Sequence, residues 1–254
     1  MQMDFEHHLK ALVYYHLEER VSAQDLLQEL RENNFAKQYI APPKGIEKSS
    51  FSEANNERGL EQFLYIFEQL YNQAHQTLPT QYSEFGELIA IDGSLIDGVL
   101  SMTWADYRKG SKKAKSHLGF DINRSIPRKV YLTDGKGDER PFVSKILNPG
   151  QTGIMDRYYQ RHKSFDLWQE EKKHFICRIR ANTIKTCIKT NDIPKDSFIS
   201  YDAIVLLGTP GGNQTKKQVR LVGYTIGKKE YWIATDRFDL TAEQIAAAYK
   251  LRWC

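Results

Sequence analysis

The segment Glu87-Leu88-Ile89-Ala90-Ile91-Asp92-Gly93-Ser94 decides how this chain is interpreted. Its four consecutive apolar residues, 88–91, predict a short strand that is buried on both faces. Asp92 follows at the carboxyl end of that strand, which is the edge where open sheets present reactive groups. An Asp-Gly turn that simply closes a strand is the plainer interpretation, and this segment taken alone favours it.

A second segment of the same kind changes that balance. Residues 151–157, Gln-Thr-Gly-Ile-Met-Asp-Arg, again predict a short apolar strand, which ends at Asp156 and is followed by Arg157. Two carboxylates at the same edge of one sheet provide the hard oxygen ligands that magnesium prefers. The sequence therefore predicts that Asp92 and Asp156 form a site for a divalent metal ion.

The composition is that of an ordinary globular protein. The 254 residues are 41% hydrophobic and 27% charged, which argues against general disorder. The 36 Lys and Arg against 32 Asp and Glu give a net charge of +4, which permits a polyanionic partner without requiring one. No apolar run approaches the roughly 20 residues of a membrane span, so we expect no membrane partner. Cys177, Cys187 and Cys254 form no C-x-x-C pair, and a reducing cytoplasm fits them.

The amino-terminal part is predicted to be helical from Phe5 to about Leu78. Ser22 and Asp25 resemble a helix cap, and residues 42–45 interrupt the helical pattern. Gly59 separates a short helix, which begins at residue 49 or 50, from a longer amphipathic one. This arrangement is compatible with a helix-turn-helix DNA reader and, equally, with a plain helical bundle. Three acidic side chains there would repel phosphate: Glu53, Glu57 and Glu61.

A basic segment follows the first predicted strand. We expect it to be a loop whose cations contact the DNA phosphate backbone, with a solvated lysine loop as the alternative. We also expect Asp97 to be a loop residue near the site and not a metal ligand. The basic residues of the segment are Arg108, Lys109, Lys112, Lys113, Lys115 and His117.

The remaining elements alternate between strands and helices until the character changes to polar β-structure near residue 181. The last helix begins at Ala242, after a cap at Asp239 or Thr241, and runs to Cys254. The predicted strands are 118–122, 129–133, 174–180, 183–189, 203–207, 217–226 and 231–235, and the predicted helices are 141–147 and 163–173.

This order of elements resembles the ribonuclease-H-like fold. The closest resemblance is to DDE transposases of bacterial insertion sequences, in the group with a tyrosine-arginine-glutamate-lysine signature. One departure is Tyr158-Tyr159, which stands where the family usually has glycine and then tyrosine. The matching segments extend from about residue 86 to the end and are Ile91–Ser94, Lys115–His117 leading to Asp121, Leu132–Lys136, Met155–Arg157 and Tyr249–Trp253.

The resemblance implies an α/β fold with a mixed sheet and flanking helices. It divides the chain into an all-helical domain, 1–85, which is a candidate for binding DNA ends, a catalytic domain, 86–180 and 231–254, and a β-rich insertion, 181–230. In such an enzyme, three carboxylates hold two Mg²⁺ ions, with Mn²⁺ as an alternative, about 3.5–4 Å apart.

The same resemblance implies cleavage at the ends of a transposon, followed by strand transfer into target DNA. The partners would be double-stranded DNA, namely terminal inverted repeats and target, and a second copy of the chain, giving a homodimer in the DNA complex. Arg157, Tyr249 and Arg252 would contact DNA phosphates near the cut. The expected location is the bacterial cytoplasm, in association with the nucleoid.

The glutamate of the signature would fall two positions beyond Cys254, and neither Asp239 nor Glu243 can replace it. We therefore expect weak or absent strand transfer from this chain. Two alternatives stay open: a non-catalytic remnant that occupies transposon ends, and a ribonuclease-H-like nuclease unrelated to transposition.

Overall fold

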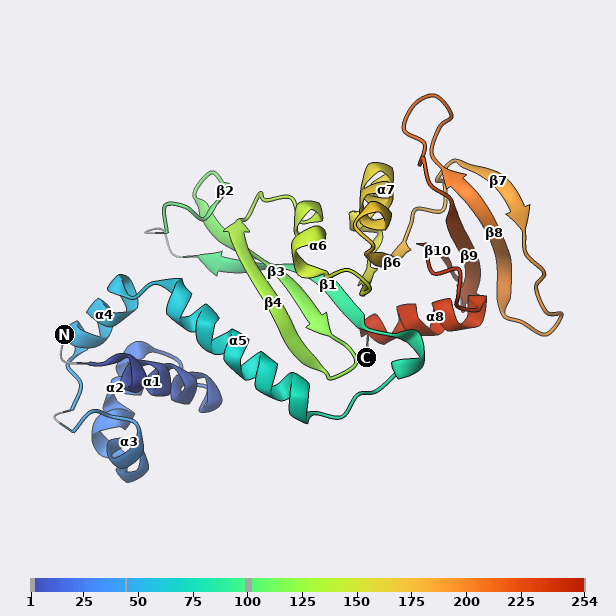
Figure 1. Ribbon diagram of the computed structural model, residues 1–254. Helices are drawn as coiled ribbons and strands as arrows, with labels where there is room; N and C mark the ends of the chain where they lie inside the picture. The colour runs from blue at the N-terminus through green and yellow to red at the C-terminus, as the bar shows by residue number, and fades with distance from the viewer. Residues whose placement is uncertain (1–2, 44, 99–101, 254) are drawn as a thin grey trace. The chain divides into compact units, whose positions relative to one another are not determined.

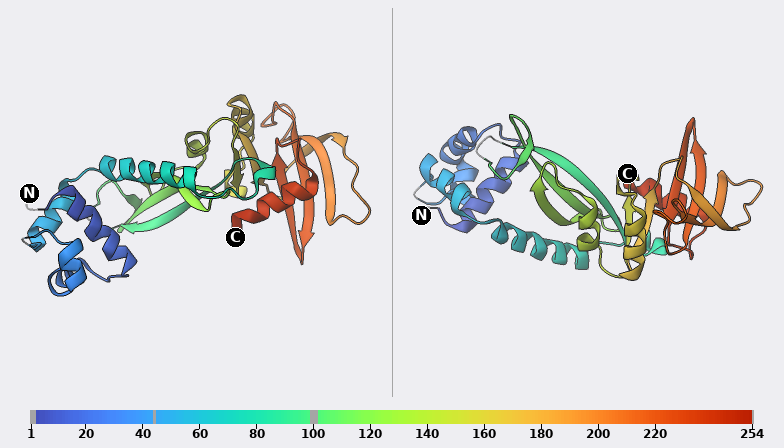
Figure 2. Two further views of the ribbon diagram at one scale, coloured as in Figure 1. Left: turned by 60° about the horizontal axis from the view of Figure 1, so that its bottom comes forward. Right: turned by 90° about the horizontal axis from the view of Figure 1, so that it is seen from above.

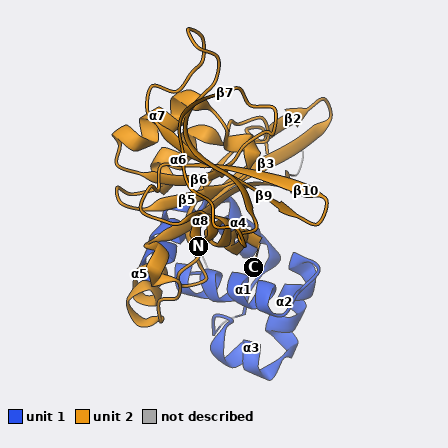
Figure 3. Ribbon diagram, turned by 90° about the vertical axis from the view of Figure 1, so that its right-hand side faces the viewer, with its two compact units in different colours: residues 1–69 blue, residues 70–254 orange. Residues whose placement is uncertain are grey.

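Figure 1 shows a computed structural model that describes residues 3–43, 45–98 and 102–253. Lys44 and Cys254, which fall within segments interpreted above, lie outside the described residues. The contacts divide the chain into two compact units, Met1–Gln69 and Leu70–Cys254 (Figure 3). The sequence analysis placed the end of the helical domain at residue 85, which is later in the chain than this division.

The first unit is helical, as predicted. Ser22 caps its second helix, because its hydroxyl accepts a hydrogen bond from the amide of Asp25 at 3.1 Å. The core of the unit is built from apolar side chains such as Leu26, Leu30 and Phe51. Its helices are α1 (Phe5–Leu17), α2 (Ala23–Glu32), α3 (Asn34–Tyr39) and α4 (Lys48–Glu57), and α5 (Leu60–Thr77) continues into the second unit.

The second unit is organised around one ten-stranded mixed sheet. Its strand order is β2-β3-β1-β5-β6-β10-β9-β8-β7, and β4 pairs with β3 beside this path. The strands are β1 (Leu88–Gly98), β2 (Asp106–Arg108), β3 (Ser111–Asp121), β4 (Ile126–Asp134), β5 (Thr152–Met155), β6 (His174–Arg178), β7 (Lys185–Thr190), β8 (Ile199–Leu207), β9 (Val219–Ile226) and β10 (Lys229–Thr235).

Helices cover both faces of this sheet (Figures 1 and 2). One face packs with α6 (Arg140–Ile146) and α7 (His162–Glu170), whose Ile146 and Trp168 join a buried cluster with Ile91. The other face packs with α8 (Ala242–Lys250), which begins in a capping box at Thr241. This arrangement confirms the predicted fold class, a mixed sheet with flanking helices. None of the described helices combines the length and the apolar character needed to cross a membrane.

Strand β1 is the main correction to the predicted secondary structure. The strand was expected to end before Asp92, yet it continues to Gly98, and its whole second half pairs with β3 alone. Asp97 therefore lies on a strand and not in a loop. These residues were missed because their side chains are mostly exposed, so the apolar pattern that marks a buried strand stops while the backbone pairing continues.

The basic segment was also predicted wrongly as a loop. Residues 106–108 and 111–121 form the strands β2 and β3, so the cations from Lys112 to His117 stand on a strand that is paired on both sides. Ala114, which lies between Lys113 and Lys115, and His117 are buried, whereas the lysines of the strand are more exposed. The polar β-rich region 181–230 was predicted as an insertion, and its strands β7, β8 and β9 continue the same sheet.

Candidate active site and nucleic-acid interface

Asp92 and Asp156 lie at the same edge of the sheet because of the register of two parallel strands. Ala90 of β1 is paired with Ile154 of β5, and each aspartate follows two residues later on its own strand path. Side chains two residues apart point to the same face of a sheet. Strand β5 ends at Met155, so from Asp92 onward β1 is paired with β3 alone and has no strand on the side where β5 lay.

Each of the two carboxylates has a different partner. An oxygen of Asp92 lies 3.1 Å from the Nη2 of Arg252, which comes from the short 3-10 turn after α8, Leu251–Trp253. The Asp156 side chain accepts a hydrogen bond of 2.8 Å from the amide of Tyr158 and so caps the turn that follows it. Asp92 is 61% exposed and Asp156 is half-buried, so both remain accessible to a ligand.

A third acidic side chain, Glu139, lies close to this pair. Its carboxylate packs against Gly93, where an added Cβ would lie only 2.3–2.6 Å from the carboxylate atoms. Lys115 holds it with an ion pair of 3.3 Å between two side chains that are each almost nine-tenths buried. No sequence pattern selects Glu139, because the residue reaches the site through the packing of α6 and not through a strand pattern.

All three of these carboxylates affect the pKa of the buried Tyr159 hydroxyl. Burial raises the pKa of Tyr159 above its usual range, and the negative charges of Glu139, Asp92 and Asp156 raise this pKa further. The negative charges of these three carboxylates therefore all act on one hydroxyl at the sheet edge. Among the described residues, however, no three His, Cys, Asp or Glu side chains are close enough together to hold a metal ion.

Asp156 lines an open pocket of about 490 Å³ with cationic and aromatic side chains. The cations are Arg157, Arg178 and Lys229, and one acid, Glu230, accompanies them. Tyr249 and Trp253 supply the aromatic groups, the first from α8 and the second from the turn that follows it. A carboxylate between cations and aromatic rings is an arrangement that suits a nucleic-acid backbone with exposed bases.

Tyr249 and Arg252 are more enclosed than their predicted role at DNA phosphates suggests. Tyr249 is only 1% exposed and the Arg252 side chain only 5%. The hydroxyl of Tyr249 and both the Nε and Nη1 of Arg252 are buried without a hydrogen-bond partner in the described structure. Burial raises the pKa of Tyr249, so its hydroxyl stays protonated and is a donor.

The cations of the basic segment differ in their surroundings. Arg108 and Lys109 are exposed at the turn between β2 and β3. Lys112, Lys113 and Lys115 pair instead with the carboxylates of Asp106, Asp97 and Glu139, respectively. The first two therefore offer free positive charge, whereas the other three have carboxylate partners that a phosphate would have to displace.

His117 does not offer a surface to phosphate. It is 1% exposed, its Nε2 lies 2.9 Å from the Thr133 hydroxyl, and its ring stacks on Phe142 at 4.0 Å between ring centres. Burial lowers its pKa to about 4, and the charge of Lys115 lowers it too, so the imidazole is neutral at pH 7. The predicted DNA contact was based on residue type and did not foresee this burial.

Positive charge is concentrated in the second unit. Residues 1–69 carry 7 Lys and Arg against 12 Asp and Glu, a net −5, and the remaining residues carry 29 against 20, a net +9. A polyanion is therefore attracted to the unit that holds Asp92 and Asp156 and repelled by the helical one. This distribution does not favour the helix-turn-helix interpretation of residues 49–77, which stays untested.

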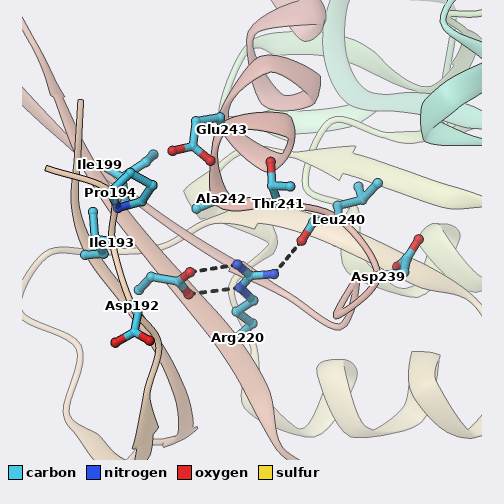
Figure 4. A pocket seen from close by; sticks show the side chains of 11 residues that line it. Asp192, Ile193, Pro194, Ile199, Arg220, Asp239, Leu240, Thr241, Ala242 and Glu243 are labelled. Atoms are coloured by element: carbon cyan, nitrogen blue, oxygen red, sulfur yellow. Dashed lines mark hydrogen bonds and ion pairs between the residues drawn. The ribbon is translucent and has the colours of Figure 1, made fainter. Parts of the chain in front are cut away.

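A pocket of about 380 Å³ beside the start of α8 has a structural explanation (Figure 4). Asp202 and Arg220 form a two-pronged ion pair there, with distances of 2.9 and 2.7 Å. Arg220 also donates to the backbone oxygen of Leu240 at 2.5 Å, which ties β9 to the segment before α8. These polar groups satisfy one another.

Comparison with known proteins identifies the family of the chain. A family model described as the transposase DDE domain matches residues 83–254, which is more than half of the chain. The chain belongs to the DDE transposase-domain family. It is also similar to a protein from Geobacillus stearothermophilus described as a probable transposase for insertion sequence element IS5377, with 25% identity over 154 residues. That match covers 60% of this chain and 41% of the relative, so the chain spans about two fifths of that protein. The insertion-sequence resemblance predicted from the sequence is confirmed, and the DDE domain contains both Asp92 and Asp156.

Proposed function

We propose that this DDE transposase domain cleaves phosphodiester bonds at the ends of an insertion sequence, with Asp92 and Asp156 as catalytic carboxylates. The observation that carries the proposal is the register of β1 and β5, which supports a common position for the two side chains at an opening of the sheet. Strand transfer into target DNA is the second step of the proposed activity.

The same two residues are the proposed ligands of Mg²⁺, or of Mn²⁺. Carboxylate oxygens are the donors that these ions select, and both side chains are accessible, so the residues fit the ion. A bound ion supplies Lewis-acid stabilisation of the charge that develops on a phosphoryl group. The protein contributes the placement of the two carboxylates, which β1 and the Asp156 turn hold before any substrate arrives.

Arg252 and Tyr249 are proposed to hold a DNA phosphate beside the cut. The Nε and Nη1 of Arg252 and the hydroxyl of Tyr249 are hydrogen-bond donors without partners, and buried donors of this kind are costly unless a ligand satisfies them. Arg157, in the pocket with Asp156, and the exposed Arg108 and Lys109 are proposed to contact flanking phosphates. Lys112, Lys113 and Lys115 are weaker candidates, since acidic partners neutralise them.

The proposed substrate is double-stranded DNA with terminal inverted repeats, bound by a homodimer that brings two ends together. With two accessible carboxylates at the edge, and with Glu139 held by Lys115, we propose that this chain gives weak strand transfer. The second candidate function is occupation of transposon ends without cleavage. The Arg252–Asp92 ion pair favours this candidate, because Arg252 occupies an oxygen of Asp92 that a metal ion would otherwise bind.

The test is Mg²⁺-dependent nicking of a labelled duplex that carries the inverted repeat of the element, measured beside gel-shift binding of the same duplex. The expected result is specific binding with slow nicking, and the nicking is abolished in Asp92→Asn and in Asp156→Asn. Specific binding without nicking would support the second candidate. Nicking with no preference for the repeat would contradict the proposal and indicate a nuclease of another kind.

A further inference from the structure

A second pocket on the DDE unit follows the turn that Asp156 caps. It has a volume of about 450 Å³, and every side chain that lines it is polar. Four of the lining residues carry a permanent positive charge, and none carries a negative charge. The charged residues are Arg140, Arg161, Lys163 and Arg180.

These cations come from different parts of the fold. Arg140 stands at the start of α6, Arg161 and Lys163 at the start of α7, and Arg180 two residues after β6. A local run of basic sequence therefore does not account for the pocket. The tertiary fold brings the charges together, which is the expected arrangement when a polyanion is the ligand.

Hydrogen bonds fix the walls of the pocket. The Gln160 side chain accepts from the amide of Arg180 at 2.9 Å and donates to the Thr183 hydroxyl at 2.9 Å. The Nδ1 of His162 donates to the backbone oxygen of Asn213 at 2.8 Å. This contact needs Gly208, whose φ is +107° and whose added Cβ would lie 2.6 Å from that nitrogen. The pocket is therefore formed in advance of binding.

Most of its charge is not neutralised within the protein. Asp138 forms an ion pair with Arg140 at 2.8 Å. Against the opposing effect of burial, the hydrogen bonds with Arg140 lower the pKa of Asp138, and the positive charge of Arg161 lowers it further. No described carboxylate lies within ion-pair distance of Arg161, Lys163 or Arg180. All three of these side chains are exposed, so they are available to a ligand from solution.

The chemistry of the walls identifies the class of ligand. Pockets for small molecules are mostly apolar with a few polar groups, and this one has no apolar side chain in its lining. Phosphate oxygens spaced along a backbone match several separate cations better than one compact anion does. The location adds to this argument, because Arg140 lies over the ring of Tyr158, 5.5 Å from its centre, in the turn directly after Asp156.

We propose that this pocket binds the sugar-phosphate backbone of the DNA strand that passes the carboxylate edge. This inference rests on the proposed function and adds a second contact region to it, beside the turn Arg157–Tyr159. The strand would extend from the pocket of Asp156 and Arg178 across this turn to Arg161, Lys163 and Arg180. The contact would be with phosphate and independent of base sequence.

The experiment measures how DNA affinity depends on salt. The full chain is titrated with a fluorescent 30-base-pair duplex of mixed sequence at several NaCl concentrations, as wild type and as Arg161→Ala/Lys163→Ala. The matched control is Lys189→Ala/Lys195→Ala, which removes two exposed lysines from another part of the unit. Each lost phosphate contact lowers the slope of log affinity against log salt by about 0.9, so the expected decrease is about 1.8 in the pocket variant. The control is expected to keep the wild-type slope.

Unchanged melting temperatures would show that both variants are folded, and Arg161→Lys/Lys163→Arg is expected to restore the slope. A wild-type slope in the pocket variant, or an equal decrease in the control, would overturn this inference and leave the proposed function standing. A wild-type chain that binds no DNA would overturn both.

A chemical footprint separates direct contact from an indirect effect. Lysine acylation of the free protein and of its DNA complex, read by mass spectrometry, is expected to show protection of Lys163 in the complex and unchanged labelling of Lys195. Equal labelling of Lys163 with and without DNA would overturn the inference.

Discussion

The pairing of Asp92 with Arg252 predicts that removal of one proposed catalytic carboxylate weakens the metal-free fold. In Asp92→Asn, the guanidinium loses a partner at 3.1 Å while 95% of its side chain stays buried. A hydrogen bond between charged groups contributes about 1.5–3 kcal/mol, and exposed ion pairs contribute about 0.2–1 kcal/mol. Because the aspartate is 61% exposed and the arginine is buried, we expect a loss between these limits, about 1–2 kcal/mol.

Asp156→Asn is the matched control for this prediction. The asparagine oxygen can still accept the hydrogen bond from Tyr158, so we expect a change within about 0.5 kcal/mol. The assay is urea unfolding without divalent metal, followed by tryptophan fluorescence. All four tryptophans, Trp104, Trp168, Trp232 and Trp253, lie in the second unit, so the signal reports that unit. Equal stability of Asp92→Asn and wild type, or a gain, would refute the structural role assigned to the pair.

Three further substitutions test other parts of the unit. His117 has a folded pKa of about 4 against about 6.5 unfolded, so its contribution to stability is complete above pH 6.5 and falls as the pH drops towards 4. Between pH 7 and pH 5 we expect the protein to lose about 2 kcal/mol through this group, and His117→Gln to lose less. Asp202→Asn leaves the buried Arg220 without its carboxylate, with an expected cost of about 3–5 kcal/mol. Gly119→Ala places a methyl group 2.4 Å from Ile146, with an expected cost of about 1–3 kcal/mol.

The same urea assay measures all three. A pH dependence in His117→Gln that equals that of the wild type would contradict the assignment to His117. An Asp202→Asn variant within 1 kcal/mol of wild type would mean that solvent reaches the ion pair. A neutral Gly119→Ala would mean that α6 moves away from β3 without loss.

The two aspartates could be selected from sequence because each one ends a run of apolar residues. Burial on both faces gives such a run, and the carboxylate then marks where the sheet opens. The helix caps at Ser22 and Thr241 were equally local and were confirmed. Features that one segment specifies by itself were therefore predictable.

Features that depend on packing between segments were not predictable from the sequence. The second half of β1 is held by backbone pairing with β3, and such pairing leaves no signature in exposed side chains. The lysines around Ala114 interrupt the alternation of apolar and polar residues that would have identified β3 as a strand. His117 was selected for its residue type although its ring is buried. Glu139 and the pocket at Arg161 are assembled from distant elements, so spacing along the chain could not identify them.

The most direct test of the central claim is a calorimetric titration of the wild type, Asp92→Asn and Asp156→Asn with Mn²⁺ as a stand-in for Mg²⁺. If the two carboxylates bind one metal site together, the wild type will bind the ion and each substitution will weaken this binding at least about tenfold, or 1.4 kcal/mol. Equal affinity in all three proteins would contradict the account, because the register of β1 and β5 would then bring together two aspartates that share no metal ion.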